Sequence, residues 1–458
     1  MAKENKKGTL SMEEWLDVAL VPNWEQPYKV PENWCWARLS ALVSLFNGDR
    51  GVNYPSKKDY VETGIPFINA GAIKDGRLEP LEYNYITQEK YDALRAGKIQ
   101  TNDILYCLRG SLGKTAIVDF ESQGAISSSL CILRASPRIS VKYLYYLLNS
   151  DTIVNQQEVA ENGSAQPNLS AASVLQYMVP LPTLAEQKRI VDRIESLFAK
   201  LDEAKEKAQA VVDGFEDRKA AILHKAFTGE LTAEWRYKNN LPESSWLEVP
   251  LESVCSSIFD GDHMPPPKAE TGVPFLVISN VNTGRLSFED TRFVPQEYYD
   301  KLSSTRKPVF GDVLYTLVGS YGIPVIVDEN RSFCFQRHMA LLKPSRINSY
   351  FLWYQLQGQA FYNKASDIAT GTAQLTVPIK GLRKLPVVLP PDAEQIEIVK
   401  LLDDLLSKDQ KAKEAAKQAI EQIDTMKKSI LTRAFRGELG TNDPNDESSV
   451  ELLKKTLR

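Results

Sequence analysis

The stretch closest to a catalytic motif is RGSLGKT at residues 109–115, which resembles a phosphate-binding loop. Such a loop needs a glycine five positions before the glycine that precedes the lysine, and Leu108 stands there instead. A similar stretch at residues 318–324, VGSYGIP, lacks both the lysine and the threonine. We therefore predict no nucleotide site, but a turn between two strands whose small residues let the backbone approach another group closely.

Metal and nucleophile chemistry have no better candidates. The three histidines lie far apart, and the five cysteines form no C-x-x-C pair, so we predict core thiols and neither a disulfide framework nor a metal site (His224, His263, His338; Cys35, Cys107, Cys131, Cys255, Cys334). The stretch DGDHMPPP at residues 260–267 places carboxylates beside a histidine, but its prolines favour a rigid polar loop. No dinucleotide-binding, zinc-protease, nucleophile-elbow or amino-methyltransferase signature occurs. We predict no catalytic residue, no metal and no cofactor bound by this chain.

Composition sets the broad class. The chain has 458 residues, 43% hydrophobic and 25% charged, which is typical of a globular protein with two or three domains. It has no apolar run of membrane-spanning length and no secretory signal, so we expect a cytoplasmic protein. The net charge of −4 gives no general attraction to nucleic acid, so any DNA site must be a local patch or depend on a partner.

An internal repeat organises the chain. With a shift of 208 residues, AILHKAFTGELT at 221–232 lies over SILTRAFRGELG at 429–440, and GIPFINAGAIKDGRL at 64–78 lies over GVPFLVISNVNTGRL at 272–286. Between residues 181 and 231, 21 of 51 positions are identical to those 208 residues later, whereas elsewhere the copies agree only at scattered points. Each half therefore combines a variable globular part with a more uniform segment.

The uniform segments are predicted to be long helices of about 45 residues, because they are rich in helix formers and nearly free of glycine and proline. Their apolar residues recur at spacings of three and four, as in a coiled-coil seam, with lysine at two matched seam positions in each copy (Lys205, Lys219, Lys413, Lys427). The apolar seam residues are Val191, Ile194, Phe198, Leu201, Val212, Phe215, Ile222, Val399, Leu402, Leu406, Ile420, Ile423 and Ile430.

Two like helices in one chain can pair with each other in antiparallel fashion. We predict α/β (α+β) heads plus long helices in an antiparallel coiled coil, with pseudo-twofold symmetry from the internal repeat. The expected domains are a first head at 1–182, a first long helix and linker at 183–236, a second head at 237–390, a second long helix at 391–440 and a polar C-terminal tail at 441–458.

The duplicated phrases resemble those of a known family. The set GSAQPNLS, VPLPTLAEQKRIV and ILHKAFTGEL, repeated as GTAQ, VVLPPDAEQIEIV and ILTRAFRGEL, is similar to the specificity subunit of type I restriction-modification systems. The resemblance implies a non-catalytic subunit with two target-recognition domains, each reading one half of a bipartite, asymmetric DNA site, and a coiled coil that sets the spacer. It also implies two adenine-N6 methyltransferase (modification) subunits that use S-adenosylmethionine, and two motor-nuclease (restriction) subunits that use ATP and magnesium.

The DNA readers are expected in loops where the two heads diverge, because the heads should read different sequences. The candidates in the first head are Asn47, Asp49, Arg50, Lys57, Lys58, Asn69, Arg77, Arg109, Ser111 and Lys114. Those in the second head are His263, Lys268, Asn280, Asn282, Arg285, Ser320, Tyr321, Arg337 and His338. The alternative interpretation of each residue is an ordinary solvated surface group.

Charge and an alternative function qualify this expectation. Neither head is basic, so we expect weak DNA binding by the isolated chain, with partner subunits neutralising much of the phosphate charge.

The alternative function is a coiled-coil scaffold whose two heads bind proteins and read no DNA. A reconstituted complex that protects no particular DNA sequence would favour the scaffold.

Overall fold

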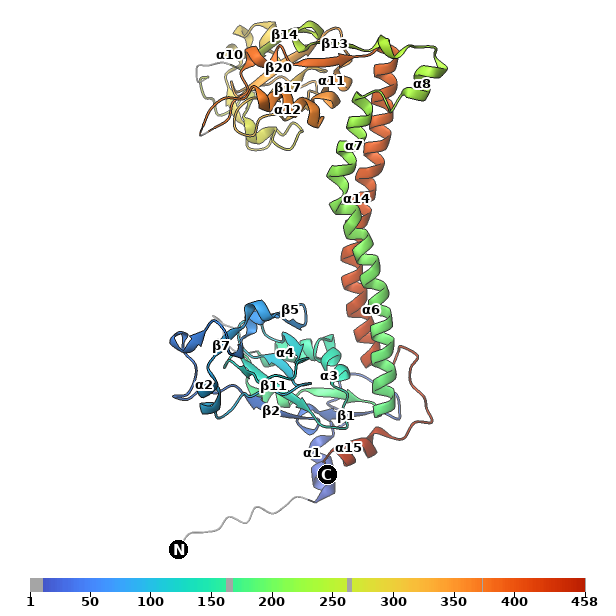
Figure 1. The fold of residues 1–458 in the computed structure, drawn as a ribbon. Coiled ribbons are helices and arrows are strands. Elements are labelled where there is room, and N and C mark those ends of the chain that lie inside the picture. Colours follow the sequence, from blue (N-terminus) through green and yellow to red (C-terminus); the bar gives the residue numbers. More distant parts are fainter. Residues whose placement is uncertain (1–10, 162–167, 262–265, 373, 458) are drawn as a thin grey trace. The chain divides into compact units, whose positions relative to one another are not determined.

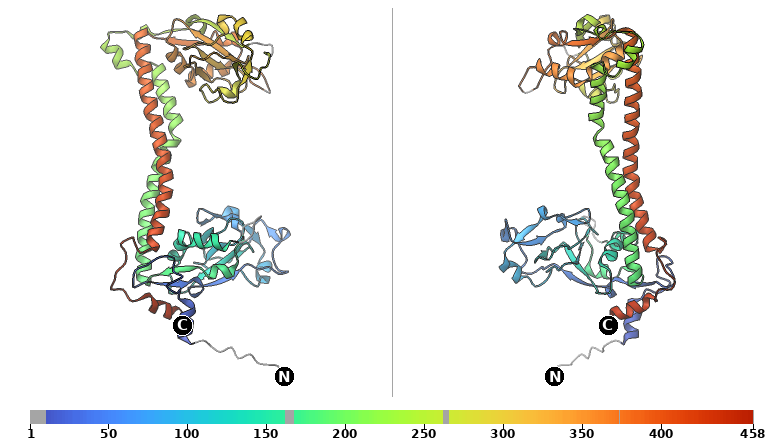
Figure 2. Two further views of the ribbon diagram at one scale, coloured as in Figure 1. Left: turned by 180° about the vertical axis from the view of Figure 1, so that it is seen from behind. Right: turned by 45° about the vertical axis from the view of Figure 1, so that its right-hand side comes forward.

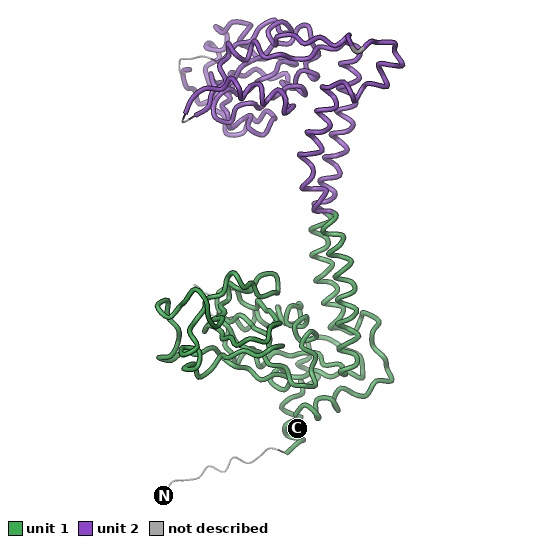
Figure 3. The backbone as a smooth tube through the Cα atoms, in the orientation of Figure 1, with its two compact units in different colours: residues 1–207, 419–458 green, residues 208–418 purple. Residues whose placement is uncertain are grey.

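The computed structural model of the protein describes residues 11–457, apart from 162–167, 262–265 and 373. The chain divides into two compact units (Figure 3). Unit 1 contains residues 1–207 and 419–458, and unit 2 contains residues 208–418. Each unit therefore holds one head together with a part of each long helical segment (Figure 1).

The head of unit 1 is built on two sheets. The larger is antiparallel and comprises, in spatial order, β2 (Val43–Asn47), β11 (Leu130–Ala135), β8 (Ile104–Cys107) and β9 (Thr115–Ile117). The other comprises β10 (Ala125–Ile126), β4 (Ile65–Ile68), β7 (Asn84–Ile86) and β3 (Tyr60–Val61). Two smaller pairs are β1 (Cys35–Arg38) with β12 (Met178–Leu181), and β5 (Ile73–Lys74) with β6 (Arg77–Leu78).

Strand β8 shows how the larger sheet is stabilised. Its four residues are all buried, because alternate side chains enter two different apolar clusters. Ile104 and Tyr106 face the main cluster, which the helices cover, while Leu105 and Cys107 face a smaller cluster beneath the loops. The helices of this head are α1 (Met12–Ala19), α2 (Gln88–Ala93), α3 (Val141–Leu148), α4 (Asp151–Ala160) and α5 (Ala171–Leu175).

The head of unit 2 repeats this plan. Its four-stranded antiparallel sheet comprises, in spatial order, β14 (Cys255–Asp260), β20 (Met339–Pro344), β17 (Val313–Thr316) and β18 (Pro324–Ile326). Beside it are β16 (Arg292–Val294), β15 (Val273–Leu276) and β19 (Cys334–Phe335), and the pair β13 (Leu247–Pro250) and β21 (Pro386–Leu389). The helices are α9 (Leu251–Val254), α10 (Gln296–Lys301), α11 (Ser349–Leu356), α12 (Gln359–Asp367) and α13 (Ile379–Leu382). The mixed strand and helix content predicted for both heads is confirmed.

The two uniform segments differ in one respect. The second forms a single helix, α14 (Asp392–Phe435), as predicted, but the first is divided into α6 (Leu184–Asp213) and α7 (Phe215–Phe227). The prediction of a single helix of about 45 residues is therefore wrong for the first segment. Gly214 has ψ of 4°, outside the helical range, and the Val211 carbonyl is bonded by the Arg218 guanidinium (Nη2–O 2.8 Å). Glycine is a poor helix former, and this side chain satisfies the carbonyl at the break.

Ion pairs show that the helical segments run antiparallel in each unit. In unit 1, Lys205 of α6 lies 2.7 Å from the Asp424 carboxylate of α14, and Lys427 of α14 pairs with Asp202 of α6, so residue numbers rise on one helix as they fall on the other. In unit 2, Arg218 of α7 lies 2.7 Å from Asp409 and Lys413 lies 3.9 Å from Glu216, which gives the same direction. All thirteen apolar seam residues named above are buried or half-buried. The seam lysine Lys413 lies over the Phe215 ring at 3.8 Å, so it covers apolar surface while its ammonium remains accessible to acids.

The ends of the long helices are embedded in the heads. Phe435, from the phrase RAFRGEL, meets the Tyr143 ring of α3 edge-on, with ring centroids 5.4 Å apart at 71°. At the matched place in unit 2, Phe227 meets Phe351 of α11 with the same separation and angle. The duplicated phrase therefore fixes each helix end to its own head by one aromatic contact.

The C-terminal segment is more ordered than a polar tail. Residues 441–458 contain α15 (Ser449–Leu457), which lies against α1 (Figures 1 and 2). Leu452 and Leu453 of this helix are buried in the main cluster of unit 1. The Ser449 backbone N–H donates to the Asn33 carbonyl at 2.9 Å. Two buried leucines among many charged residues give this short helix an apolar face, which the composition of the whole segment conceals.

Candidate nucleic-acid interface

A buried ion pair fixes the same point of the framework in both heads. The Asp103 carboxylate, 1% exposed, accepts hydrogen bonds from Arg134 Nε at 2.7 Å and Nη2 at 2.8 Å. In unit 2, Asp312 accepts from Lys343 Nζ at 2.5 Å. Burial raises the pKa of Asp312 above its usual range, although the Lys343 ammonium acts in the opposite direction. Each pair joins the start of a central strand to its neighbour and so supports the loops around it.

Asp49, a candidate from the first variable loop, is committed to the structure of that loop. It is 9% exposed, and its carboxylate accepts the backbone N–H groups of Arg95 and Gly51, both at 2.9 Å. These two hydrogen bonds, that from Arg95 first, hold the pKa of Asp49 below its usual value. An acceptor used in this way organises the loop and is not free to meet a base.

The same loop exposes a set of cations. Asn47 is half-buried on β2, whereas three basic candidates are exposed: Arg50, Lys57 and Lys58. The loop begins at Gly48, where a Cβ would lie 2.6 Å from the Ser127 carbonyl oxygen. Glycine therefore allows the loop to leave the sheet at close backbone contact, and the cations follow within ten residues.

The matching loop of unit 2 begins in the same way. A Cβ on Gly261 would lie 2.4 Å from the Phe335 carbonyl oxygen. Among the candidates here, Lys268 and Arg337 are exposed, and His263 lies outside the described residues. His338 is half-buried with its Nδ1 2.8 Å from Gln336 Nε2, and burial followed by the nearby Arg337 lowers the pKa of this histidine. A neutral imidazole is therefore favoured near neutral pH.

The two glycine turns pack against their own heads. A Cβ on Gly113 would lie 2.0 Å from Gln157 Oε1 of α4, and one on Gly322 would lie 2.7 Å from the Tyr362 ring of α12. The close approach predicted for these turns is therefore intramolecular. The exposed side chains at the turns are Arg109, Ser111, Lys114 and Ser320. Tyr321 is stacked on Tyr362, with ring centroids 5.6 Å apart, and is partly covered.

The remaining candidates lie between β4 and the end of β6 in unit 1 and in the segment after β15 in unit 2. The Asn69 side chain accepts the Gly71 backbone N–H at 2.7 Å. Asn280 is 5% exposed and bonded to the backbone at Val277 and Glu289, so both asparagines serve local structure. The exposed side chains in this region are Arg77, Asn282 and Arg285.

The AEQ phrase at residues 185–187 and 393–395 builds the junction between each head and its long helix, a role that the sequence analysis did not predict. The Gln187 side chain accepts the Ser140 backbone N–H at 2.8 Å and donates to the Pro182 carbonyl at 3.1 Å. Gln395 makes the equivalent contacts, accepting from Asn348 N–H at 2.7 Å and donating to the Pro390 carbonyl at 2.8 Å. The signal that could have indicated this role is the identity of the phrase in two otherwise divergent copies.

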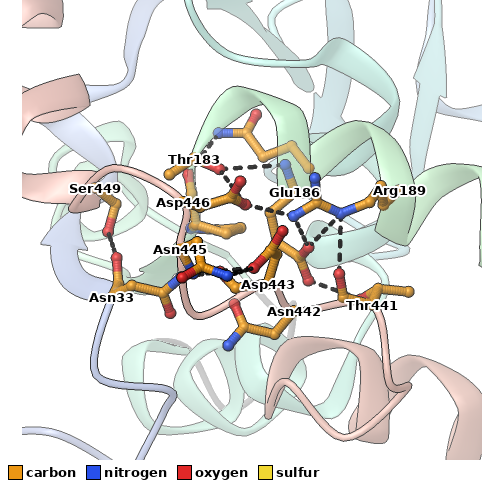
Figure 4. Close-up of polar contacts among 12 residues, drawn as sticks. Asn33, Thr183, Glu186, Arg189, Thr441, Asn442, Asp443, Asn445, Asp446 and Ser449 are labelled. Atoms are coloured by element: carbon orange, nitrogen blue, oxygen red, sulfur yellow. Dashed lines mark hydrogen bonds and ion pairs between the residues drawn. The ribbon is translucent and has the colours of Figure 1, made fainter.

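The preceding glutamates, Glu186 and Glu394, hold the chain segments that follow α14 and α7. Glu186, 1% exposed, accepts from Thr441 at 2.7 Å and pairs with Arg189, which also reaches Asp446 (Figure 4). Figure 4 shows these side chains turned toward one another where the C-terminal segment passes the start of α6. Burial raises the pKa of Glu186.

The matched carboxylate in unit 2 is more enclosed. Glu394, 0% exposed, accepts from Thr232 at 2.7 Å, Arg236 at 2.6 Å and Trp246 at 2.9 Å. Arg236 belongs to α8 (Ala233–Lys238) and has 8% of its side chain exposed. The link between the long helix and the second head is therefore held by one buried charge pair.

The described residues were also compared with the requirements of a metal site and of a membrane span. Among the described residues, no group of three or more His, Cys, Asp and Glu side chains is placed to hold a metal ion, and no helix is long and apolar enough to cross a membrane. Four of the five cysteines are buried, and the fifth, Cys255, is half-buried; burial raises the pKa of Cys255.

Comparison with known proteins agrees with the duplicated architecture. The family described as type I restriction modification DNA specificity domain matches residues 31–212 and 243–422, once in each half. The chain is 25% identical over 429 residues to the EcoKI specificity subunit of Escherichia coli K12, covering 90% of each protein, and 28% identical over 431 residues to the EcoBI specificity subunit, covering 90% of this chain and 87% of that one. The crystal structure of the HsdS subunit from Thermoanaerobacter tengcongensis shares the fold, with a TM-score of 0.65 and 23% identity over 91% of this chain and 100% of that chain. The chain therefore belongs to the type I restriction modification DNA specificity domain family.

Proposed function

We propose that this chain is the non-catalytic specificity subunit of a type I restriction-modification complex. Each head reads one half of a bipartite, asymmetric DNA site in the major groove, and the coiled coil sets the spacer between the halves. The observation that carries the proposal is one framework built twice with different exposed loops. The ion pair at Asp103 recurs at Asp312, whereas Arg50, Lys57 and Lys58 have no like-for-like counterparts in the second head.

The two heads meet the needs of readout in different ways. Hydrogen-bonding side chains must be exposed and free to reach base edges. In unit 1 the exposed candidates are concentrated in the loop after β2 and at the glycine turn. In unit 2 they are spread over the loop after β14, the segment between β15 and β16, the glycine turn and the loop after β19. Because the chemistry of these loops differs, the two halves of the recognised site are expected to differ in sequence.

Two equivalent grooves support the docking of two modification subunits. In unit 1 a cavity of about 630 Å³ lies between α4 and the end of α14, next to Thr152, Thr432 and Arg436. In unit 2 a cavity of about 200 Å³ is bordered by the matched residues Ala360, His224 and Thr228, each 208 positions away. A partner present in two copies requires two related surfaces on a single chain.

The partner subunits supply the chemistry that this chain lacks. We assign S-adenosylmethionine and adenine-N6 methylation to the modification subunits, and ATP, magnesium and cleavage to two restriction subunits, all in the cytoplasm. Because neither head carries an excess of basic residues, the partners also provide much of the phosphate neutralisation, and the isolated chain binds DNA weakly.

The proposal is tested by mapping methylated adenines on random-sequence DNA with the complete methyltransferase complex. We expect one motif of two half-sites separated by a fixed gap. Arg50→Ala should relax positions in one half only, and Arg337→Ala positions in the other half only, each by about 1–3 kcal/mol per lost base contact. A methylation pattern unchanged when this chain is omitted would instead support the scaffold alternative.

The role of the coiled coil as a spacer is tested separately. Seven residues are inserted after residue 207 of α6 and seven at the facing position of α14, after residue 421, so that the heptad seam is preserved. At 1.5 Å per residue this adds about 10 Å, or about three base pairs of DNA. Unchanged half-sites with a longer gap are expected, and altered half-sites would contradict this role.

A further inference from the structure

The internal repeat separates two kinds of DNA contact. Side chains that differ between the heads can read sequence, but an exposed side chain that is identical in both must serve something that both heads meet. The phosphate backbone is the same along any DNA sequence. A matched, exposed and unpaired cation that does not border the junction between a head and its long helix is therefore expected to contact phosphate.

Most matched polar residues do not qualify, because they have partners inside their own head. Lys98 donates to the Asp92 carbonyl at 3.3 Å and lies over the Tyr91 ring. Its counterpart Lys307 donates to the Asp300 carbonyl at 3.1 Å and lies over the Tyr299 ring. These lysines close the ends of α2 and α10, so their identity in the two heads has a structural reason.

Arg77 and Arg285 are different. Both are exposed, and each follows a glycine with positive φ, +75° at Gly76 and +77° at Gly284. Within the described residues neither guanidinium forms a hydrogen bond or ion pair. The turn beneath each arginine is nevertheless fixed, since the next residue is a leucine packed on the smaller apolar cluster of its head (Leu78 and Leu286).

Unit 1 adds a further restraint on this turn. The Tyr145 hydroxyl of α3 donates to the Gly76 carbonyl at 3.3 Å, and β6 contacts β9 at the edge of the main sheet. A free guanidinium on a restrained turn loses little backbone entropy when it binds. Its planar fork can also donate two parallel hydrogen bonds to one phosphate.

We propose that Arg77 and Arg285 are equivalent phosphate contacts that position each head on the duplex without reading bases. This assignment rests on the proposed function and removes both arginines from the set of base-reading candidates. Each head then contacts the DNA backbone in the same way, and its variable loops read a different base sequence.

The test uses the complete methyltransferase complex and duplexes with and without the methylated motif. Binding is measured by fluorescence anisotropy over a series of salt concentrations. Arg77→Ala and Arg285→Ala should each weaken binding to both duplexes by the same factor, and each should lower the slope of log K against log salt by about 0.9. The methylated motif should remain unchanged.

A matched control is available in the same heads. Arg138 and Arg346 are also exposed and 208 positions apart, but they lie two residues before Ser140 and Asn348, where Gln187 and Gln395 bind the head to its long helix. Arg138→Ala removes the same charge and should leave the salt slope unchanged. Folding of every variant is checked by its assembly with the modification subunit.

The outcomes are distinguishable. A wild-type complex that protects its motif, with an Arg77→Ala variant that keeps the wild-type salt slope, overturns the phosphate assignment alone. The same conclusion follows if Arg77→Ala changes the motif, or if Arg138→Ala lowers the slope equally. A wild-type complex that shows no preference for any sequence overturns the proposed function itself.

Discussion

Removal of the buried glutamate at each head–helix junction should have unequal effects, although the two residues occupy matched positions. Glu394→Ala leaves the Arg236 guanidinium, with 8% of its side chain exposed, without its counter-charge. It also removes the acceptor for Thr232 and Trp246. Breaking a buried ion pair in this way costs about 3–5 kcal/mol.

Glu186→Ala should cost less. Its partner Arg189 has 38% of its side chain exposed and keeps both Asp446 and the Thr441 carbonyl as acceptors. The remaining loss is one hydrogen bond to a buried carboxylate and a solvent-accessible ion pair, or about 1–2 kcal/mol.

Hydrogen exchange read by mass spectrometry measures both effects locally, which is needed because a chain of two units has no single unfolding free energy. At about 1.4 kcal/mol per factor of ten, Glu394→Ala should accelerate exchange in peptides covering 229–250 by at least about 100-fold, provided that exchange follows local opening. Glu186→Ala should accelerate exchange in peptides covering 441–453 by about tenfold. Replacing both partners, as Arg236→Met with Glu394→Leu, should recover much of the loss. Equal acceleration at the two junctions would refute the argument from burial.

Three further predictions concern other parts of the molecule. Arg218→Met should destabilise the α7–α14 pairing by about 2–3 kcal/mol, because Asp409, 13% exposed, loses its cation. Adding Asp409→Leu reproduces the matched pair Met426 and Leu201 of unit 1 and should restore hydrogen-exchange protection in peptides covering α7. Because two backbone hydrogen bonds lower the pKa of Asp49, this carboxylate stabilises the fold fully above its unfolded value of 3.8, and the contribution is lost as pH falls through the lower folded pKa. Asp49→Asn should remove that part of the acid sensitivity from the hydrogen-exchange protection of the loop at residues 48–55, measured from pH 5 downward. Leu453→Ala should cost about 2–4 kcal/mol and accelerate hydrogen exchange around Asn33, whereas the same substitution at the exposed Leu184 should have little effect on that region.

The C-terminal segment of unit 1 and the segment that follows α7 in unit 2 occupy matched places in the repeat. In unit 2 the segment after α7 leads from Arg236 to Trp246 and on into β13, and both side chains bond to Glu394. In unit 1 the matching segment is the one after α14, residues 436–457. It binds Glu186 through Thr441 and then reaches Asn33 through Ser449, next to the start of β1. The C-terminal segment thus takes the structural place that the inter-head linker takes in the other unit.

The repeat, the seam and the strands were readable from the sequence because each is a local or periodic pattern. A shift of 208 residues places Phe227 on Phe435 and Glu186 on Glu394, and a spacing of three and four places Ile194 and Leu402 on buried helix faces. The heads' strands, such as β8, follow from short runs of apolar and β-branched residues bounded by turn residues. Each of these features is a pattern of residue types along the chain, so it can be found without knowing which residues meet in the folded protein.

Only the tertiary structure decided which polar residues are free. Asp49 and Arg50 are adjacent in the sequence and equally plausible as DNA contacts, yet the carboxylate is bonded to the backbone at Arg95, 46 residues away, while the guanidinium is exposed. A single glycine, Gly214, was compatible with a continuous helix in the sequence. The helix is broken there because Arg218, held by Asp409, donates a hydrogen bond to the Val211 carbonyl. The polar tail became a docked helix because Leu452 and Leu453 meet a core assembled from distant segments. In each case the outcome depends on groups brought together by folding, and a hydrogen bond or apolar contact between residues far apart in the sequence leaves no local pattern to read.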